Sequence, residues 1–458
     1  MIELMTHQAE CSKFWAAHKR ILNHGDTGTG KTISALDGYV KSVAGRLLVI
    51  APLSILRPAW GADIDKFLPN FSWAVAHGST KKRMEAFRSG ADIVLINHDG
   101  VKWIRDQLLE DEHFLGSFSH CVVDEYTAYK NRSSQRSKAM RFIAENVEYL
   151  QLLSGTPNSN KITDLWYPVY LVDKGQRLGD NFYRFQNETC SGKPVPGAPR
   201  ATIWEEKAGS RDVVGNLLRD ITIRHTLQEC VDIPENTRRT MSVDMPASVM
   251  AAYRQLERDA YLAMEDGVIT AVHAGARTKK ILQLLSGAVY DEEGEVVKIH
   301  PHRYELVIDL VAEREHSVVA FNWRHERQQL CQLADARKIK YGIIDGSVSA
   351  NARNEVVNAY QNGELQVIFA HPQSAGHGLT LTRGTSTIWA SPTYNAEHYV
   401  QFNARIYRKG QDKKTETICI AASNTKEEEV YEKLAGKCER MSDLLGIFAQ
   451  NTRLGVAA

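Results

Sequence analysis

The chain has 458 residues, with 56 Lys and Arg against 55 Asp and Glu, so its formal net charge at pH 7 is only +1. Hydrophobic residues make up 43% of the chain and charged residues 24%, a composition that is typical of a folded globular protein and excludes a disordered or collagen-like chain. The length predicts two to four domains, at roughly 100–200 residues per domain. The near-zero net charge is unfavourable for nucleic-acid binding, because affinity for phosphates comes from Lys and Arg.

Signals for export or membrane insertion are weak. No apolar run approaches the roughly 18 residues that span a bilayer, and the longest, residues 47–56, contains Pro52 and Ser54. The N-terminus carries Glu3 where a secretory signal carries positive charge. The 7 cysteines are widely spaced and form no C-x-x-C pair, which argues against a disulfide framework or a zinc site. We therefore expect an intracellular protein without a membrane partner.

Short apolar runs rich in β-branched residues recur along the chain, and each precedes a turn signal and a helical pattern. The runs cover residues 47–51, 93–96, 121–123 and 150–153 in the first half, and residues 318–321, 341–344, 367–369, 387–390 and 417–421 in the second. Uninterrupted apolar strands that alternate with helices indicate parallel sheets covered on both faces. The sequence therefore predicts two α/β lobes.

The stretch between the two sets of strands has a different pattern. Residues 161–297 are mostly helical in pattern, with a long helix over residues 249–263 and a Pro/Gly loop over residues 192–199. We predict a first lobe over residues 1–160, a mainly helical insertion and linker over residues 161–300, and a second lobe over residues 301–458.

One segment has the pattern of a phosphate-binding loop. Residues 25–32, GDTGTGKT, satisfy G-x-x-x-x-G-K-[ST], and an apolar helical pattern follows at once. Glycines let backbone N–H groups surround a polyphosphate, and the start of the helix adds positive potential. Lys31 is expected to reach the β- and γ-phosphates, and Thr32 to bind Mg²⁺. The residues that we predict to line the nucleotide are Asp26, Thr27, Gly28, Thr29, Gly30, Lys31 and Thr32.

A second element is needed, because phosphate loops also occur in kinases, GTPases and transporters. Asp124 and Glu125 follow the apolar run 121–123. An acid at the end of such a strand can hold Mg²⁺, and its neighbour can orient or deprotonate the attacking water. Acidic pairs after strands also serve as helix caps, so the assignment depends on the phosphate loop. Together they predict Asp124 as a metal ligand and Glu125 as the catalytic base.

Further short segments accompany these two motifs. In the first half they are THQ at residues 6–8, IAPLSIL at 50–56 with Trp60, INHD at 96–99, DEYT at 124–127 with Lys130 and Asn131, and LSGTPNSN at 153–160. In the second half they are DGS at residues 345–347 with Arg353, AGHGLTLT at 375–382 and QFNARIYRKGQ at 401–411. In order and spacing these segments resemble the motifs of superfamily-two nucleic-acid motors, specifically the Swi/Snf-like family of DNA translocases, including its annealing-helicase branch.

The resemblance covers residues 6–445 and implies a fold, an activity and a set of site residues. It implies two RecA-like lobes joined by a helical insertion, with ATP and Mg²⁺ as cofactors. By resemblance, Gln8 reads adenine, and Ser154 and Thr156 couple hydrolysis to movement. The nucleic-acid contacts that it implies are Ser54, His98, Lys130, Asn131, Asn160 and Thr382.

The segment 401–411 also has an interpretation of its own. Gln401, Arg405 and Arg408 recur at helical spacing, which predicts one shared helix face. Two guanidiniums on a second-lobe helix are suited to stabilise transition-state charge on the γ-phosphate. A solvated basic helix face is the alternative. We expect all three residues to take part in catalysis.

Two departures from the family pattern bear on coupling. Tyr126 and Thr127 replace the usual Ala-His pair, and Thr380 stands where many relatives have Asn. Neither change touches Lys31 or the carboxylates, so hydrolysis is expected and its stimulation by DNA is less certain.

A local basic segment offers a nucleic-acid track despite the low net charge. Residues 126–141 contain three Arg and two Lys and no acid, a pattern suited to phosphate contacts that carry no sequence preference. A solvated helix face is again the alternative. We predict an ATP-hydrolysing translocase that moves along or remodels duplex, branched or single-stranded DNA, cytoplasmic or nucleoid-associated, with a possible protein partner for targeting. A processive fork or RNA helicase and an ATP-switched DNA-binding scaffold are the alternatives.

Overall fold

The chain forms two compact units. The computed structural model describes residues 3–42, 45–157, 161–195, 198–265, 271–290, 293, 295–376 and 378–456. The first unit consists of Met1–Cys190, Glu206–Asp232 and Glu439–Ala458, and the second of Ser191–Glu205 and Ile233–Cys438. The chain thus enters the first unit three times.

A parallel sheet of seven strands, in the order β3-β4-β2-β5-β6-β1-β9, forms the centre of the first unit. The strands are β1 (Arg20–Asn23), β2 (Arg46–Ala51), β3 (Trp73–Ala76), β4 (Ile93–Asn97), β5 (Phe118–Asp124), β6 (Tyr149–Leu153) and β9 (Thr222–Ile223). The four apolar runs of the first half are confirmed as β2, β4, β5 and β6. The edge strands β3 and β9 were not predicted.

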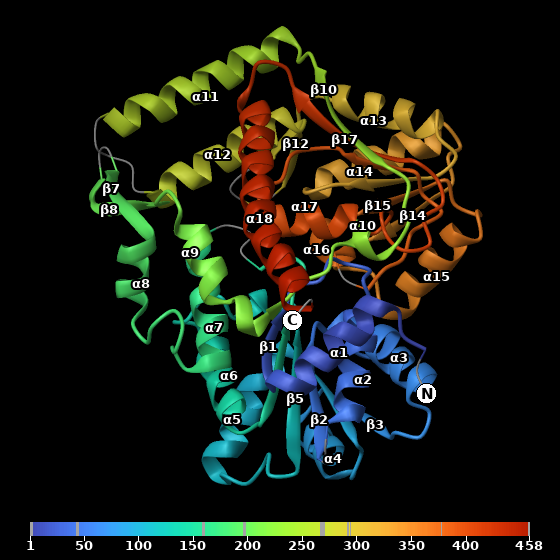
Figure 1. The fold of residues 1–458 in the computed structure, drawn as a ribbon. Helices are drawn as coiled ribbons and strands as arrows, with labels where there is room; N and C mark the ends of the chain where they lie inside the picture. Colours follow the sequence, from blue (N-terminus) through green and yellow to red (C-terminus); the bar gives the residue numbers. More distant parts are fainter. Residues whose placement is uncertain are drawn as a thin grey trace. The chain divides into compact units, whose positions relative to one another are not determined.

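Helices cover both faces of this sheet. The helices of the first unit are α1 (Thr6–His18), α2 (Lys31–Lys41), α3 (Ala62–Phe67), α4 (Thr80–Arg88), α5 (Val101–Glu110), α6 (Gln135–Glu145), α7 (Trp166–Asp173), α8 (Phe182–Thr189), α9 (Ser210–Leu217) and α10 (Leu227–Cys230). Figure 1 shows α1, α2 and α3 along one side of the sheet and α5, α6 and α7 along the other. Leu36, Leu47 and Trp60 belong to the apolar core under α1–α3.

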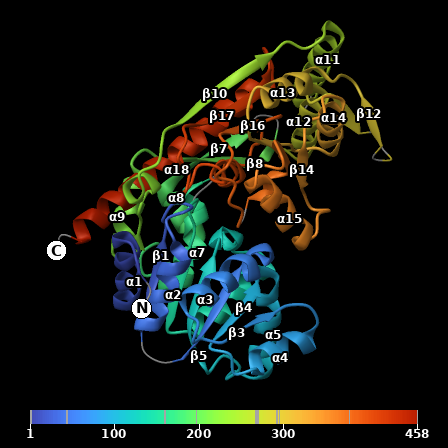
Figure 2. The same ribbon diagram turned by 90° about the vertical axis from the view of Figure 1, so that its right-hand side faces the viewer.

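The second unit contains a parallel sheet of six strands in the order β10-β17-β16-β13-β15-β14. The strands are β10 (Asn236–Val243), β13 (Ser317–Ala320), β14 (Tyr341–Ile344), β15 (Val367–Ala370), β16 (Ser386–Trp389) and β17 (Thr415–Ala422). Five of them confirm the predicted runs. The sixth, β10, was not predicted and lies beside β17 along its whole length (Figure 2), from Asn236 opposite Thr415 to Val243 opposite Ala422.

Two apolar cores pack on this second sheet. The helices of the unit are α11 (Ala247–Glu265), α12 (Ala271–Leu285), α13 (His302–Ala312), α14 (Arg324–Ala336), α15 (Ala350–Gln361), α16 (Pro372–Ala375), α17 (Ala396–Asn403) and the start of α18 (Lys426–Val456). One core contains residues of α13 and α14, and the other contains residues of α15, α17 and α18. Helix α18 begins in the second unit, and its residues from Glu439 onward belong to the first. The two α/β lobes of the predicted fold class are confirmed.

The part of the sequence that was predicted as a mainly helical insertion, residues 161–300, contains strands as well as helices. The segment that was predicted as a Pro/Gly loop forms β7 (Cys190–Val195) and β8 (Ala198–Glu206), which pair in a two-stranded sheet. The loop prediction is therefore wrong for the part of this segment that the structure describes. A second pair, β11 (Ala288–Tyr290) and β12 (Val296–Lys298), is antiparallel.

All seven cysteines are free. Among the described residues, no helix has the combination of length and apolar character that crossing a membrane requires.

A buried ion pair fixes the start of α18 in the second unit. Arg303 Nη2 lies 2.6 Å from Glu427 Oε2, and neither side chain has exposed surface. We expect Glu427→Gln to destabilise the second unit by about 3 kcal/mol, because it leaves the guanidinium charge buried without its partner. The measurement is the urea-unfolding midpoint of this unit. Glu315→Gln, which removes an exposed partner of Lys413, is the matched control and should leave that midpoint in place.

Candidate functional site

Three predicted motifs follow three neighbouring strands at one edge of the first sheet. Asn23 at the end of β1 pairs in register with Leu153 at the end of β6, and Leu153 pairs with Asp124 at the end of β5. The carboxyl edge of a parallel sheet is where open α/β folds bind ligands. The phosphate loop, the acidic pair and the segment that begins at Ser154 are therefore brought together by the strand order alone.

The phosphate loop connects β1 to α2. Gly28 and Gly30 have φ values of 93° and 83°, in the left-handed region that favours glycine. A Cβ atom on Gly30 would lie 2.3 Å from Gln8 Nε2, so any other residue would displace that side chain as well as strain the backbone. Lys31 Nζ donates to the carbonyl oxygens of Gly25 (2.7 Å) and Asp26 (3.1 Å). The lysine thus already points back over its own loop.

Helix α1 brings Gln8 to the phosphate loop. Gln8 Nε2 donates to the carbonyl oxygen of Thr29 at 3.3 Å, and His7 Nε2 lies 2.7 Å from the same oxygen. The ring centroids of His7 and His225 are 5.7 Å apart. The structure therefore places the predicted Gln8 beside the loop, together with His7 of the same THQ segment, and adds His225, which no sequence motif signalled.

The two carboxylates of the acidic pair, Asp124 and Glu125, have different surroundings. Asp124 Oδ2 accepts a hydrogen bond from Trp60 Nε1 at 3.0 Å. Burial raises the pKa of Asp124, and the Lys31 ammonium and the Trp60 N–H oppose that rise. Burial likewise lowers the pKa of Lys31, which the two carboxylates counteract. Glu125 has φ 55° and ψ 56°, a left-handed conformation that is costly for a non-glycine residue.

Trp60 lies in an unusual segment. It belongs to η2 (Leu56–Gly61), a π-helix that directly follows the 3₁₀ turn η1 (Leu53–Ile55), and its side chain is fully buried. Single π turns are frequent at functional sites. The resemblance pointed to this segment as a nucleic-acid contact, whereas the Trp60 side chain serves the acidic pair.

The segment predicted to couple hydrolysis to movement packs against the phosphate loop. Ser154 and Thr156 are both buried, and Ser154 Oγ accepts a hydrogen bond from the Thr156 N–H at 3.1 Å. The Ser154 N–H donates to the carbonyl oxygen of Asn23 at 3.1 Å. A Cβ atom on Gly155 would lie 3.5 Å from the Gly25 carbonyl oxygen, which is ordinary contact distance.

Arg224, which the sequence analysis did not identify, binds the start of the phosphate loop. Its Nη2 lies 2.9 Å from Asp26 Oδ1, and its Nη1 donates to the carbonyl oxygen of His24 at 2.7 Å. The Leu227 N–H donates to the other carboxylate oxygen of Asp26. The Arg224 N–H donates to Thr452 Oγ1, so the C-terminal part of α18 touches the same support. No local pattern signals this arginine, which lies about 200 residues beyond the loop it holds.

In the second unit, the prediction of one shared helix face for Gln401, Arg405 and Arg408 is wrong. Helix α17 ends at Asn403, so the two arginines lie in the turns that follow it. They still converge, because Arg405 Nη1 (3.3 Å) and Arg408 Nη1 (2.6 Å) both donate to the carbonyl oxygen of Leu379. Burial lowers the pKa of Arg408.

The predicted nucleic-acid contacts differ in exposure. Ser54 and Asn131 are exposed, and Lys130 and Thr382 are half-buried. His98 is buried, with its Nδ1 2.9 Å from the Tyr129 hydroxyl. Asn160 lies outside the described residues. The role of these residues in binding stays a prediction.

The basic segment 126–141 is partly engaged within its own unit. Arg136 pairs with Asp99 at 2.5 Å and Arg141 with Glu145 at 2.7 Å. Arg132 lies 4.7 Å from the centroid of the Phe182 ring. These partners reduce the positive charge that the segment offers to a phosphate backbone.

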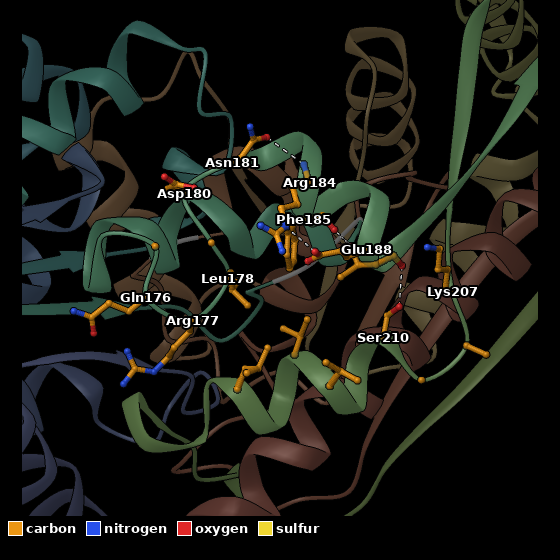
Figure 3. A pocket seen from close by; sticks show the side chains of 18 residues that line it. Gln176, Arg177, Leu178, Asp180, Asn181, Arg184, Phe185, Glu188, Lys207 and Ser210 are labelled. Atoms are coloured by element: carbon orange, nitrogen blue, oxygen red, sulfur yellow. Dashed lines mark hydrogen bonds and ion pairs between the residues drawn. The ribbon is translucent and has the colours of Figure 1, made fainter.

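A separate cavity of about 520 Å³ lies in the first unit between the turn at residues 175–181, α8 and α9 (Figure 3). Leu178, Phe185 and Val214 supply apolar lining, and the Arg184–Glu188 pair (2.9 Å) runs along α8 beside it. None of the predicted site residues lines this cavity. It is therefore not part of the site at the carboxyl edge.

The arrangement at the carboxyl edge suits one kind of chemistry. The loop offers backbone N–H groups and a lysine to a polyphosphate. Thr32 and Asp124 offer hydroxyl and carboxylate oxygens, the hard donors that Mg²⁺ prefers. Glu125 is a second carboxylate next to this donor set. The residues thus fit a nucleoside triphosphate with its metal ion and a water nucleophile.

Comparison with known proteins gives matches over most of the chain. The SNF2-related domain matches residues 7–289, and the helicase conserved C-terminal domain matches residues 302–410. Protein p41 of Acyrthosiphon pisum secondary endosymbiont phage 1 is 28% identical over 436 residues, which cover 91% of each chain. The DNA annealing helicase and endonuclease ZRANB3 of Bos taurus is 24% identical over 414 residues, covering 87% of this chain and 36% of the bovine protein.

Among solved structures, the SWI2/SNF2 ATPase core of Sulfolobus solfataricus in complex with dsDNA is similar at 19% identity and a TM-score of 0.44, over 99% of this chain and 95% of that chain. The resemblance that the motifs indicated is confirmed by the domain matches, and the first of them alone covers more than half of the chain. The chain belongs to the SNF2-related family.

Proposed function

We propose that the chain is an ATP-hydrolysing DNA translocase that moves along or remodels DNA without reading its sequence. One observation carries the proposal: the register of β1, β6 and β5 brings the phosphate loop, the coupling segment and the acidic pair to a single edge of the first sheet. The names of relatives such as the bovine annealing helicase support DNA as the track.

In this proposal the first unit binds ATP. Gln8 contacts the adenine, the loop from Asp26 to Thr32 surrounds the phosphates, and Lys31 turns from its own loop carbonyls to the β- and γ-phosphates. Thr32 and Asp124 would hold Mg²⁺, which when bound neutralises phosphate charge. Glu125 accepts a proton from the attacking water.

The second unit contributes cations. Arg405 and Arg408 stabilise the charge that develops on the γ-phosphate, and Gln401 supports them. Two guanidiniums that donate to the same neutral carbonyl oxygen are arranged so that an anion would relieve their mutual repulsion. Hydrolysis then weakens this attraction, so that the two units grip DNA alternately.

DNA contacts are expected from both units. Ser54, Lys130 and Asn131 in the first unit and Thr382 in the second reach phosphates, with His98 and Asn160 as further contacts. The low net charge of +1 favours modest, salt-sensitive binding that is confined to one groove. Such a function would operate inside the cell, in the cytoplasm or at the nucleoid, and a protein partner would supply the targeting.

Trp60→Phe is expected to weaken metal binding, because it removes the hydrogen bond to Asp124 and keeps an aromatic ring in the core. Loss of such a support costs about ten-fold in metal affinity. The readout is the affinity for Mn²⁺ in the presence of ADP, followed by electron paramagnetic resonance. Trp73→Phe removes an equivalent bond to Asp65 (2.7 Å) and should leave Mn²⁺ affinity unchanged. Equal Mn²⁺ affinities for the Trp60 variant and the wild type would contradict the assignment.

The proposed function is tested by the rate of ATP hydrolysis without nucleic acid and with single-stranded DNA, duplex DNA, forked DNA or RNA. We expect DNA to stimulate turnover. No stimulation by any nucleic acid would reject the motor, and stimulation by RNA alone would reject DNA as the track. ATP-dependent DNA binding without turnover would instead indicate a scaffold that ATP switches.

A further inference from the structure

Two buried side chains meet between the phosphate loop and the acidic pair. His24 directly precedes the loop, and Tyr126 directly follows Glu125. The distance between His24 Nε2 and the Tyr126 hydroxyl oxygen is 2.7 Å, and neither residue has exposed surface. This hydrogen bond joins two segments that are 102 residues apart in the sequence.

The surroundings favour a persistent bond. Burial, followed by the nearby Arg224 and Lys31 cations, lowers the pKa of His24 to about 3, so the imidazole is neutral at neutral pH. A neutral imidazole and a phenol hydroxyl form one hydrogen bond with each other. Separating them would take the Tyr126 hydroxyl away from an imidazole that has no exposed surface. Loss of a hydrogen bond by a buried polar group costs about 1–3 kcal/mol.

Tyr126 also bears on the conformation of Glu125. The left-handed backbone of Glu125 costs about 1–3 kcal/mol and persists only where neighbouring contacts determine it. Tyr126 is the first residue of the 3₁₀ turn η4 (Tyr126–Tyr129), immediately after that strained residue. Fixing the Tyr126 ring therefore fixes the direction in which the Glu125 side chain leaves the backbone.

His24 is held in turn by distant parts of the first unit. Its N–H donates to the carbonyl oxygen of Ile223 at 2.9 Å, and its own carbonyl oxygen accepts from Arg224 Nη1 at 2.7 Å. The Phe448 ring of α18 lies 5.1 Å from the imidazole, centroid to centroid. These contacts hold His24 in place, so its bond to Tyr126 can position the neighbouring Glu125.

We propose that His24 and Tyr126 are positioning residues whose hydrogen bond holds the Glu125 carboxylate in place relative to the phosphate loop. The proposal rests on the proposed hydrolysis of ATP at this site. Since neither side chain touches ATP in this scheme, breaking the bond affects the chemical step and leaves nucleotide binding in place.

Tyr126→Phe and His24→Phe each remove the bond and keep an aromatic ring in the core. We expect each variant to lower kcat at saturating duplex DNA about ten-fold, since small displacements of a catalytic group are costly. The affinity for a fluorescent ATP analogue and the KM for ATP should stay within about two-fold of wild type. The double variant should have a kcat within about two-fold of the slower single variant, because both changes remove the same interaction.

Tyr167→Phe is the matched control. Tyr167 is a largely buried tyrosine of the first unit whose hydroxyl donates to the Ser137 carbonyl oxygen at 2.8 Å, and it belongs to neither motif. Its loss should change thermal stability as much as the loss of the Tyr126 hydroxyl and should leave kcat unchanged. A general loosening of the unit would instead lower kcat in this control as well.

The outcomes separate this proposal from the function on which it rests. A wild-type chain that turns over ATP beside a Tyr126→Phe variant with normal kcat would overturn the positioning pair alone. The positioning pair would also be overturned if the losses of kcat in the two single variants multiplied in the double variant. It would be overturned as well if the affinity for ATP fell together with kcat. No turnover by the wild type would overturn the proposed function and the pair with it.

Discussion

Glu125→Gln is expected to abolish ATP turnover and leave ATP affinity close to that of the wild type. The amide has nearly the shape of the carboxylate and cannot accept a proton from water, so the loss in kcat should reach about 10³-fold. Asp124, which we assign to the metal, is the neighbouring carboxylate and is the one bonded to Trp60. The measurement is kcat at saturating DNA together with equilibrium binding of a non-hydrolysable ATP analogue.

Asp124→Asn provides the contrast for this experiment. Loss of a metal ligand should weaken binding of the nucleotide with its metal as well as turnover, so the two variants should differ in affinity and agree in inactivity. If Glu125→Gln lost ATP affinity to the same extent as Asp124→Asn, the division of roles between the two carboxylates would be wrong.

Most interior strands of both sheets could be predicted because apolar residues dominate them, whereas the interior strand β1, with the sequence RILN, was not among the predicted runs. Strands β4 and β15 are buried at every position, and such runs have few alternatives to a covered parallel strand. Strand β10 was missed because it is an edge strand with the polar sequence NTRRTMSV and no fully buried position. Its β structure depends on pairing with β17 rather than on its own composition.

The site residues divide in the same way. The phosphate loop and the acidic pair are each formed by consecutive residues, and their function depends on local backbone geometry. A sequence pattern therefore detects both. Arg224 acts on the phosphate loop from about 200 residues away, through contacts that leave no spacing to detect. Trp60 belongs to a segment that the resemblance assigned to nucleic acid, and its bond to Asp124 could not be predicted from that pattern. Helix α17 likewise ends at Asn403, and the turns after it bring both arginines to the Leu379 carbonyl oxygen. Regular helical spacing could not predict these turns.

Arg408→Ala is expected to lower kcat by about 10³-fold with a much smaller change in ATP affinity, because an arginine that meets charge developing on the γ-phosphate acts mainly in the transition state. Arg408 belongs to the second unit and the phosphate loop to the first. The variant therefore tests whether the second unit takes part in the chemical step. The measurement is kcat and KM for ATP at saturating DNA, with analogue binding as the separate measure of affinity.

Arg314→Ala distinguishes loss of this function from loss of structure. Arg314 also belongs to the second unit, where it bonds Glu416 at 2.5 Å and the Leu310 carbonyl oxygen at 2.7 Å. Both variants remove a guanidinium that is hydrogen-bonded to its own unit, so both should lower the thermal stability of that unit. Only Arg408→Ala should lose turnover, since only Arg408 lies beside Arg405 at the Leu379 carbonyl oxygen. Normal turnover in Arg408→Ala, or equal losses in both variants, would remove the arginine from the proposed chemistry and leave hydrolysis to the first unit alone.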